Sequence, residues 1–267
     1  MRALRSELLK LATTRTWWVL AIILFVWIAV NASGIAALGG VLVEQSQGMV
    51  EDAAIPALVF SVVTATGYVF PLLFGALAST TEFRHQTLTP TFLATPRRGV
   101  VLAGKVGAGL LGGFVYGIVG LIASVGIGSL VMQLVGVSPG LDSSDNWALI
   151  ARALVAMALW AVIGIGLGVL IPNQVAVIVS VLAFTQFLEP LLRLGASFWE
   201  WTAYVGRLLP GAATDALVGS SIYSVALAPA AEGVAALEWW QGGLVLGGYA
   251  LVFIALGALT TWRRDVT

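Results

Sequence analysis

Six long apolar stretches constrain this chain more than any other feature of its sequence. A helix needs about 20 consecutive apolar residues to cross the hydrocarbon core of a bilayer, because each residue advances it by about 1.5 Å. Charged residues make up 10% of the 267 positions, whereas soluble domains carry about 25%. We therefore predict an all-α membrane protein, a single domain over residues 1–267 with six transmembrane helices. The predicted spans are residues 17–40, 56–79, 106–135, 148–171, 175–194 and 240–261.

The first apolar stretch follows a basic N-terminus, which is also how a signal peptide begins. Four basic residues within residues 1–16 precede an uncharged run over residues 17–43. The apolar region of a signal peptide has only about 7–15 residues. We therefore predict an uncleaved first span. Cleavage near Ala32-Ser33-Gly34, whose small residues suit a signal peptidase, is the alternative.

The basic residues are unevenly distributed, although the net charge of the chain is zero. Ten of the 13 lie in residues 1–16, in residues 80–105 or in the tail after residue 261. Short loops rich in Lys and Arg stay on the cytoplasmic side of a membrane. We therefore predict a multi-pass protein of the cell membrane, inner or plasma, with both termini in the cytoplasm.

Three segments outside the spans have a distinctive composition. Residues 1–16 place their leucines on one side of an amphipathic helix. Residues 80–105 are polar and basic but contain scattered apolar side chains, as a protein-docking segment does. Residues 195–239 are too apolar for a solvated loop and are rich in aromatic residues, which favour the membrane–water boundary. We predict outer re-entrant or interfacial helices there.

Glycines recur every four residues in the third span, at Gly109, Gly113 and Gly117. This spacing leaves a smooth stripe along one helix face, where a second helix can approach closely. The sequence leaves two partners open for this stripe: another span of the same chain, or a second copy in a dimer.

The chain has few residues of the kinds that carry enzyme chemistry. It contains no cysteine and one histidine, His85, which excludes thiolate chemistry and a multi-histidine metal site within one chain. The segment from Gly99 to Lys105 has the spacing of a phosphate-binding loop, but the Ser or Thr that would follow the lysine is missing. We read Lys105 as a snorkelling anchor at the end of a span. We predict that this chain is not an enzyme and binds no cofactor, metal or nucleic acid.

Polar residues inside the spans are candidates for a substrate path. They are Asn31, Thr64, Thr66, Gln133 and Gln186. Hydrogen bonding between helices is the simpler explanation for each of them. Glu189 and Arg193 stand four residues apart, which predicts a local ion pair. Pro190 between them bends the helix and leaves a gating role as an alternative.

Two motifs resemble the permease subunits of ABC-2-type transporters, which have the type V exporter fold. The first begins Glu82-Phe-Arg-His-Gln-Thr87 and continues through Pro96-Arg-Arg98 to Gly104-Lys105. The second is the outer segment from Leu209 to Leu217. The resemblance extends over the whole chain in span number and loop size. Gln86 departs from it, since many relatives have glycine there.

The resemblance implies how this chain obtains its energy. Residues 1–16 would be the elbow helix, and residues 80–105 would hold a cytoplasmic coupling helix that seats in a separate ATPase subunit. Two ATPase copies, which bind the ATP and Mg²⁺, would join two permease chains as a homodimer or heterodimer in the membrane lipid. The coupling residues would be Glu82, Phe83, Arg84, Thr87, Leu88, Phe92, Arg97 and Arg98. Glu82 is expected in a cluster with Arg84, Arg97 and Arg98, where its carboxylate pairs with a basic residue of either subunit.

We therefore predict the permease subunit of an ATP-driven exporter for a drug-like, lipidic or peptide substrate. A passive channel or an ion-driven carrier is the first alternative, although carriers usually place charged residues at mid-membrane and none is evident there. A membrane scaffold or an enzyme without nucleotide coupling is the second. The substrate, the direction of transport, the identity of the ATPase and the choice between homodimer and heterodimer stay open at this stage.

Overall fold

The computed structural model describes residues 2–46, 54–196, 200–221 and 237–262. These residues form helices joined by turns, with no strand among them. Six of the helical segments are long and apolar enough to cross a membrane, which confirms the predicted all-α, multi-pass architecture. They cover Thr16–Gln45, Ala54–Arg84, Arg98–Leu134, Ser144–Leu170, Gln174–Ala196 and Trp239–Leu259.

Three spans are single helices, and three are interrupted. The uninterrupted helices are α2 (Thr16–Ser46), α8 (Ser144–Leu170) and α14 (Trp239–Leu259). The second span consists of α3 (Ala54–Ala65) and α4 (Val69–Arg84). The third consists of α6 (Arg98–Leu121), the π-helical turn η1 (Ile122–Ile127) and α7 (Gly128–Leu134), and the fifth of α9 (Gln174–Ala183), η2 (Phe184–Leu188) and α10 (Glu189–Ala196). Such π-turns recur at functional sites.

Helix α8 forms the centre of the bundle, where it packs against α4, α6 and α14. Glycines make this close packing possible. A Cβ atom on Gly113 of α6 would lie 2.6 Å from the main-chain oxygen of Met157 on α8, and one on Gly168 of α8 would lie 2.5 Å from that of Ala76 on α4. The glycine stripe of the third span therefore packs within the chain, which decides between the two partners that the sequence left open.

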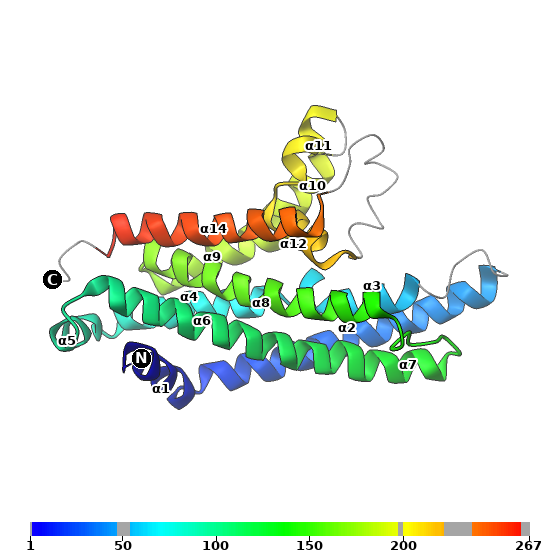
Figure 1. Ribbon diagram of the computed structural model, residues 1–267, viewed down its shortest axis with the longest axis horizontal. Helices are drawn as coiled ribbons and strands as arrows, with labels where there is room; N and C mark the ends of the chain where they lie inside the picture. Colours follow the sequence, from blue (N-terminus) through cyan, green and yellow to red (C-terminus); the bar gives the residue numbers. More distant parts are fainter. Residues whose placement is uncertain (1, 47–53, 197–199, 222–236, 263–267) are drawn as a thin grey trace.

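Two short helices lie at the end of the bundle where α2 begins and α14 ends (Figure 1). Helix α1 (Arg2–Thr13) packs against α6, and α5 (Leu88–Ala94) connects α4 to α6. We call this end the basic end. The polar connection here is shorter than residues 80–105, because α4 continues to Arg84 and α6 already begins at Arg98.

Three more short helical segments follow the bend in the fifth span. Helices α10 and α11 (Glu200–Gly206) stand out from the side of the bundle (Figure 1). Helix α12 (Pro210–Val218) returns to pack against α14, α8 and α3. Up to residue 218, the described part of the predicted outer segment 195–239 is helical except for the turn at residues 207–209, while Phe198, Trp199 and residues 222–236 lie outside the described residues.

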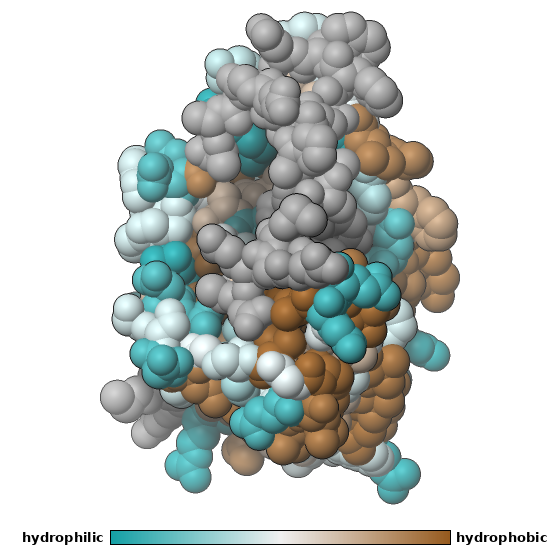
Figure 2. Space-filling view, turned by 90° about the vertical axis from the view of Figure 1, so that its right-hand side faces the viewer, coloured by the Kyte–Doolittle hydropathy of each residue, from teal (hydrophilic) through white to brown (hydrophobic). Residues whose placement is uncertain are grey.

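The surface of the bundle is apolar along much of its flank. Figure 2 looks onto the end opposite the basic end and shows hydrophobic residues gathered on one side, with hydrophilic residues on the other. Many exposed large side chains belong to the candidate spans, including Val30, Leu134, Val175 and Leu251. A flank of this kind requires a hydrocarbon environment, as expected for a multi-pass membrane protein.

Candidate functional site

Helix α5 is held on the basic end by apolar contacts. Leu88 is 1% exposed. The ring of Phe92 meets that of Trp262 edge to face at 5.3 Å, and Phe83 contacts the same indole at 6.2 Å. Arg98 lies 5.0 Å over the Phe92 ring and donates a hydrogen bond to the Trp262 carbonyl at 2.9 Å. These contacts position α5 against the last turn of the sixth span.

The same contacts separate the eight predicted coupling residues into two groups. Arg84, Thr87 and Arg97 are exposed on and around α5 and are available to a partner. The others face the chain itself: Glu82 and Leu88 are buried, and Phe83, Phe92 and Arg98 pack on Trp262. Leu93 was absent from the predicted set, yet it is 80% exposed. Its position five residues after the buried Leu88, on the other face of the short helix, was the available signal.

Gln86 forms the sharp turn between α4 and α5. Its φ is +53°, and no other non-glycine residue in the described part of the chain has a positive φ. Side chains with a Cβ are strained in this left-handed region, whereas glycine is not. Glycine would therefore fit this position with less strain than Gln86 does.

A buried ion network joins α1, α4 and α6 at the basic end. Lys105 Nζ lies 2.8 Å from Glu7 Oε2 and 2.9 Å from Glu82 Oε2. Lys10 Nζ lies 2.7 Å from Glu7 Oε1 and 2.8 Å from Glu82 Oε1. The two carboxylates and two ammonium groups balance in charge, and Lys105 is only 2% exposed. We call these four residues the basic-end network.

The network corrects two predictions. Glu82 does not pair with Arg84, Arg97 or Arg98, since both of its oxygens face lysines inside the chain. Lys105 is not a snorkelling anchor, because its ammonium group is buried between two carboxylates rather than placed in water. The missed signal was an acid, Glu7, within the apolar stripe of the N-terminal helix. An unpaired carboxylate is rarely buried, so its position required a cation from another helix.

Charge balance in the network overcomes the cost of burial. Burial by itself raises the pKa of Glu7. The adjacent Lys105 and Lys10 together lower this pKa by more than burial raises it, so the pKa of this carboxyl lies below its ordinary value. Burial by itself lowers the pKa of Lys10, but hydrogen bonds to Glu7 and Glu82 leave the pKa of this ammonium group above its ordinary value. Both groups are therefore charged at neutral pH, and α1 is locked to the bundle electrostatically.

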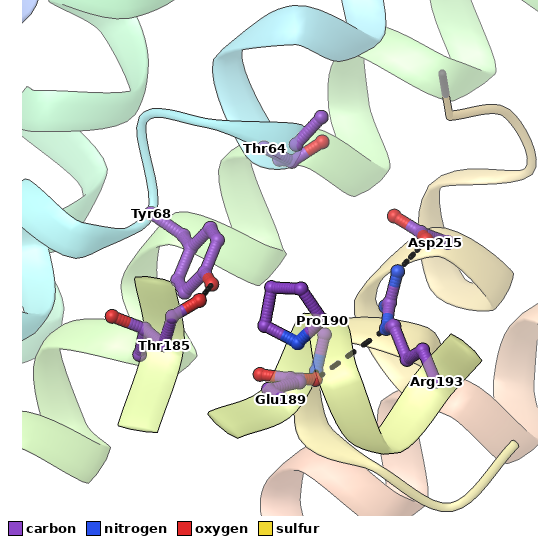
Figure 3. Close-up of a pocket in the computed structure, with 9 residues that line it drawn as sticks. Thr64, Tyr68, Thr185, Glu189, Pro190, Arg193 and Asp215 are labelled. Carbon is purple, nitrogen blue, oxygen red and sulfur yellow. Dashed lines mark hydrogen bonds and ion pairs between the residues drawn. The ribbon is translucent and has the colours of Figure 1, made fainter. Parts of the chain in front are cut away.

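A second charged cluster lies where the fifth span bends (Figure 3). Arg193 Nη1 donates to Asp215 Oδ2 at 2.8 Å, and its Nε lies 3.6 Å from Glu189 Oε1. The main-chain N–H of Gly211, in the first turn of α12, donates to Glu189 Oε1. The expected local pair of Glu189 and Arg193 is therefore present, but it is part of a larger cluster that fastens α12 to α10. We call Glu189, Arg193 and Asp215 the bend cluster.

The bend cluster borders a small cavity of about 20 Å³, enough for about one water molecule. Figure 3 shows Thr64, Tyr68 and Thr185 on the side away from Arg193 and Asp215. Glu189 is 2% exposed, and its Oε2 has no hydrogen-bond partner among the described residues. Burial raises the pKa of Asp215, and Arg193 opposes this shift. The sequence predicted the pair of Glu189 and Arg193 in the fifth span but not that Asp215 of α12 joins it.

The five predicted path residues do not line one common cavity. Thr64 borders the small cavity beside the bend cluster. Thr66 accepts a hydrogen bond from Trp27 Nε1 at 3.2 Å, and Asn31 donates to the main-chain oxygen of Trp27 at 2.8 Å. Gln133 and Gln186 are exposed on α7 and η2. The bond between Trp27 and Thr66 joins two spans, as the simpler explanation proposed.

Comparison with known proteins assigns neither a family nor a function to this chain. No model of a protein family matches the chain. No curated protein sequence matches it either. The basic end, with α5 and the basic-end network, and the bend cluster are the two features of the described residues that bear on function.

Proposed function

We propose that this chain is the permease subunit of an ATP-driven exporter of the ABC-2 type, which moves an apolar or amphipathic substrate out of the cytoplasm. The observation that carries the proposal is α5, a separate helix beyond the spans that is seated on Trp262 and presents Arg84, Leu93 and Arg97. This surface combines one apolar anchor with flanking cations, which suits a docking site for an acidic or apolar groove of another protein.

The contacts around α5 offer a route for transmitting movement. Helix α5 is continuous with α4 and α6 through short turns, and both of these helices pack on the central α8. The basic-end network ties α1 to the same two helices. A displacement imposed on α5 therefore reaches three helices of the bundle together rather than bending one loop. Docking of an ATPase subunit at this end would couple ATP hydrolysis to the spans.

The proposed arrangement includes orientation and assembly. The protein would lie in the cell membrane, inner or plasma, and its basic end would face the cytoplasm. Two ATPase subunits, which hold ATP and Mg²⁺, would bind two permease chains, one on each α5.

The bend cluster favours a second candidate, an ion-driven carrier. The sequence shows no charged residue at mid-membrane, which made an ion-driven carrier the less favoured alternative. Glu189 and Arg193 lie in the fifth candidate span, where Glu189 is buried, and Arg193 also pairs with Asp215 of α12. Buried ionisable groups within a membrane protein commonly bind protons or ions during transport. ATP dependence of transport separates the two candidates.

A test of the exporter uses two charge reversals at the basic end. Arg97→Glu, combined with Leu93→Ala, alters the exposed surface of α5, and the control Arg5→Glu reverses an exposed charge on α1. Chains are solubilised mildly from their native membranes, co-purifying ATPases are identified by mass, and ATP hydrolysis is measured. Loss of an interface anchor costs about 2 kcal/mol or more. We expect the α5 variant to lose the ATPase and the control to retain it.

Two results would reject the exporter. One is that no nucleotide-binding subunit co-purifies with the wild-type protein. The other is transport in vesicles that continues without ATP and follows an imposed proton gradient, which would favour the carrier.

A further inference from the structure

A second, larger cavity lies inside the bundle between α4, α8, α9 and α14. Its volume is about 320 Å³, which is within the range of about 300–1,000 Å³ that is typical of ligand sites. Helix α9 packs mainly against α4, whereas α14 packs mainly against α8 and α12. The cavity occupies the space between these two pairs. Pro210 of α12 closes it on the side of the bend cluster.

The cavity is elongated along the helices. On α8 its wall extends from Trp160 to Ile171. Eleven residues of α-helix correspond to about 16 Å. The opposite wall runs along α9 and η2 from Val177 to Thr185. A space of this shape accommodates a chain that lies parallel to the helices rather than a compact molecule.

The walls offer almost no hydrogen bonds to a ligand. The indole N–H of Trp160 donates to Thr214 Oγ1 at 3.0 Å, and the hydroxyl of Tyr249 donates to the main-chain oxygen of Leu208 at 3.2 Å. The remaining walls are mostly aliphatic or phenyl side chains. A ligand that needed polar partners would lose its own hydration here without replacement. The chemistry of the walls therefore selects hydrocarbon.

The opening of the cavity faces the flank of the bundle. Ser180 on α9 is exposed, and Tyr249 and Phe253 on α14 are partly exposed. Their neighbours Val179 and Leu251 are 59% and 70% exposed on the outer faces of the same two candidate spans. An empty apolar space of this size would forfeit dispersion contacts along all its walls. Hydrocarbon chains of the bilayer are the apolar groups present at that opening.

We propose that this cavity binds one acyl chain of a bilayer phospholipid, lying parallel to α8 with its entry between α9 and α14. The proposal is independent of the exporter function. It has a structural consequence, because Pro210 and Thr185 line the cavity. Gly211, next to Pro210, donates to Glu189 of the bend cluster, which lies four residues after Thr185. A bound chain would support the corner where α12 returns to the bundle.

The test uses two pairs of variants with matched substitutions. Ser180→Phe places a ring in the cavity from α9, and Val179→Phe places the same ring on the exposed face of that helix. Phe253→Trp and the exposed control Leu251→Trp repeat the comparison on α14. The second pair keeps the test valid if the first cavity variant does not fold.

The probe is phosphatidylcholine with a diazirine near the end of one acyl chain, in phosphatidylcholine vesicles that contain the full-length protein. After illumination, labelling of the buried Val181 is measured relative to that of the exposed Val175. We expect strong labelling of Val181 in the wild type and both controls, and its loss in Ser180→Phe and Phe253→Trp, with Val175 labelled throughout.

Three outcomes would overturn the proposal. The first is wild-type protein labelled only at exposed residues such as Val175. The second is equal labelling of Val181 in the cavity-filling variants and their controls. The third is labelling of Val181 by a single-chain lysolipid probe but not by phosphatidylcholine, since the occupant would then be a single-chain amphiphile and not a bilayer phospholipid.

Discussion

Replacing Lys105 by methionine tests whether the basic-end network holds α1 on the bundle. Lys105→Met keeps the length of the aliphatic stem but removes the charge between Glu7 and Glu82. Lys105 is 2% exposed, so water does not replace the lost partner. Removing one partner of a buried ion pair costs roughly 3–5 kcal/mol. Lys10 still contacts both carboxylates and offsets part of this, so we expect a loss of about 3 kcal/mol.

The matched control is Lys10→Met. Lys10 makes the same number of ion pairs at similar distances, but its side chain is 37% exposed. Solvent screening reduces the value of such a pair, and we expect a cost of about 1 kcal/mol. The double variant Glu7→Gln with Lys105→Met restores charge balance. It should recover at least half of the stability that Lys105→Met loses, because Lys10 is then the partner of one carboxylate instead of two.

Two measurements follow the effect. The free energy of unfolding is obtained from a denaturant titration in mixed micelles. Docking of α1 is followed by maleimide labelling of Ala3→Cys, which is unique because the chain contains no cysteine. Ala3 packs beside Gly104 of α6 in the docked state, so labelling should accelerate when α1 is released. Equal stability and equal labelling in Lys105→Met and Lys10→Met would refute the argument that burial decides the strength of this network.

Four further predictions follow from particular residues. Gly211→Ala should destabilise the return of α12 by about 1–3 kcal/mol, because its Cβ would lie 2.5 Å from Glu189 Oε1, whereas Gly247→Ala on α14 meets open space and should not destabilise. Since the pKa of Glu7 is lowered from 4.5, its contribution is complete above pH 4.5 and is lost as the pH falls through the folded-state pKa; the free energy of unfolding should therefore fall on acidification, and Glu7→Gln should weaken this dependence. An impermeant thiol reagent should label Ser144→Cys in intact cells and Thr87→Cys only after the membrane is opened; the reverse pattern would invert the proposed orientation. Gln86→Gly should stabilise the chain by up to about 1 kcal/mol by removing left-handed strain at φ +53°, while His85→Gly, at φ −94°, should destabilise it.

The sequence predicted local features of the fold well. The six spans agree with the candidate membrane helices to within a few residues at most ends, because the length of an uncharged apolar run determines whether a helix can cross a bilayer. It did not predict that α6 begins at Arg98, some eight residues before the expected span at 106. Lys105, between the first residues of α6 and the apolar run, concealed its start, since hydropathy marks the membrane boundary and not the end of a helix.

The candidate site was predicted only in outline. The importance of residues 80–105 was clear from their composition, and the structure places α5 there. The role of each side chain was not clear, because a seven-residue helix has two faces. Only the position of Trp262, more than 160 residues away, decides that Phe92 and Arg98 face inward while Leu93 and Arg97 face outward.

The sequence by itself therefore determined the class of this protein, its six spans and its polar ends, since these depend on the transfer of contiguous side chains between water and hydrocarbon. The tertiary structure alone decided which charges meet. Glu82 lies beside Lys10 from 72 positions earlier, Lys105 beside Glu7 from 98 positions earlier, and Arg193 beside Asp215 from 22 positions later. A buried charge must find its partner wherever packing brings two helices together, and that proximity is a property of the folded bundle and not of neighbours in the chain.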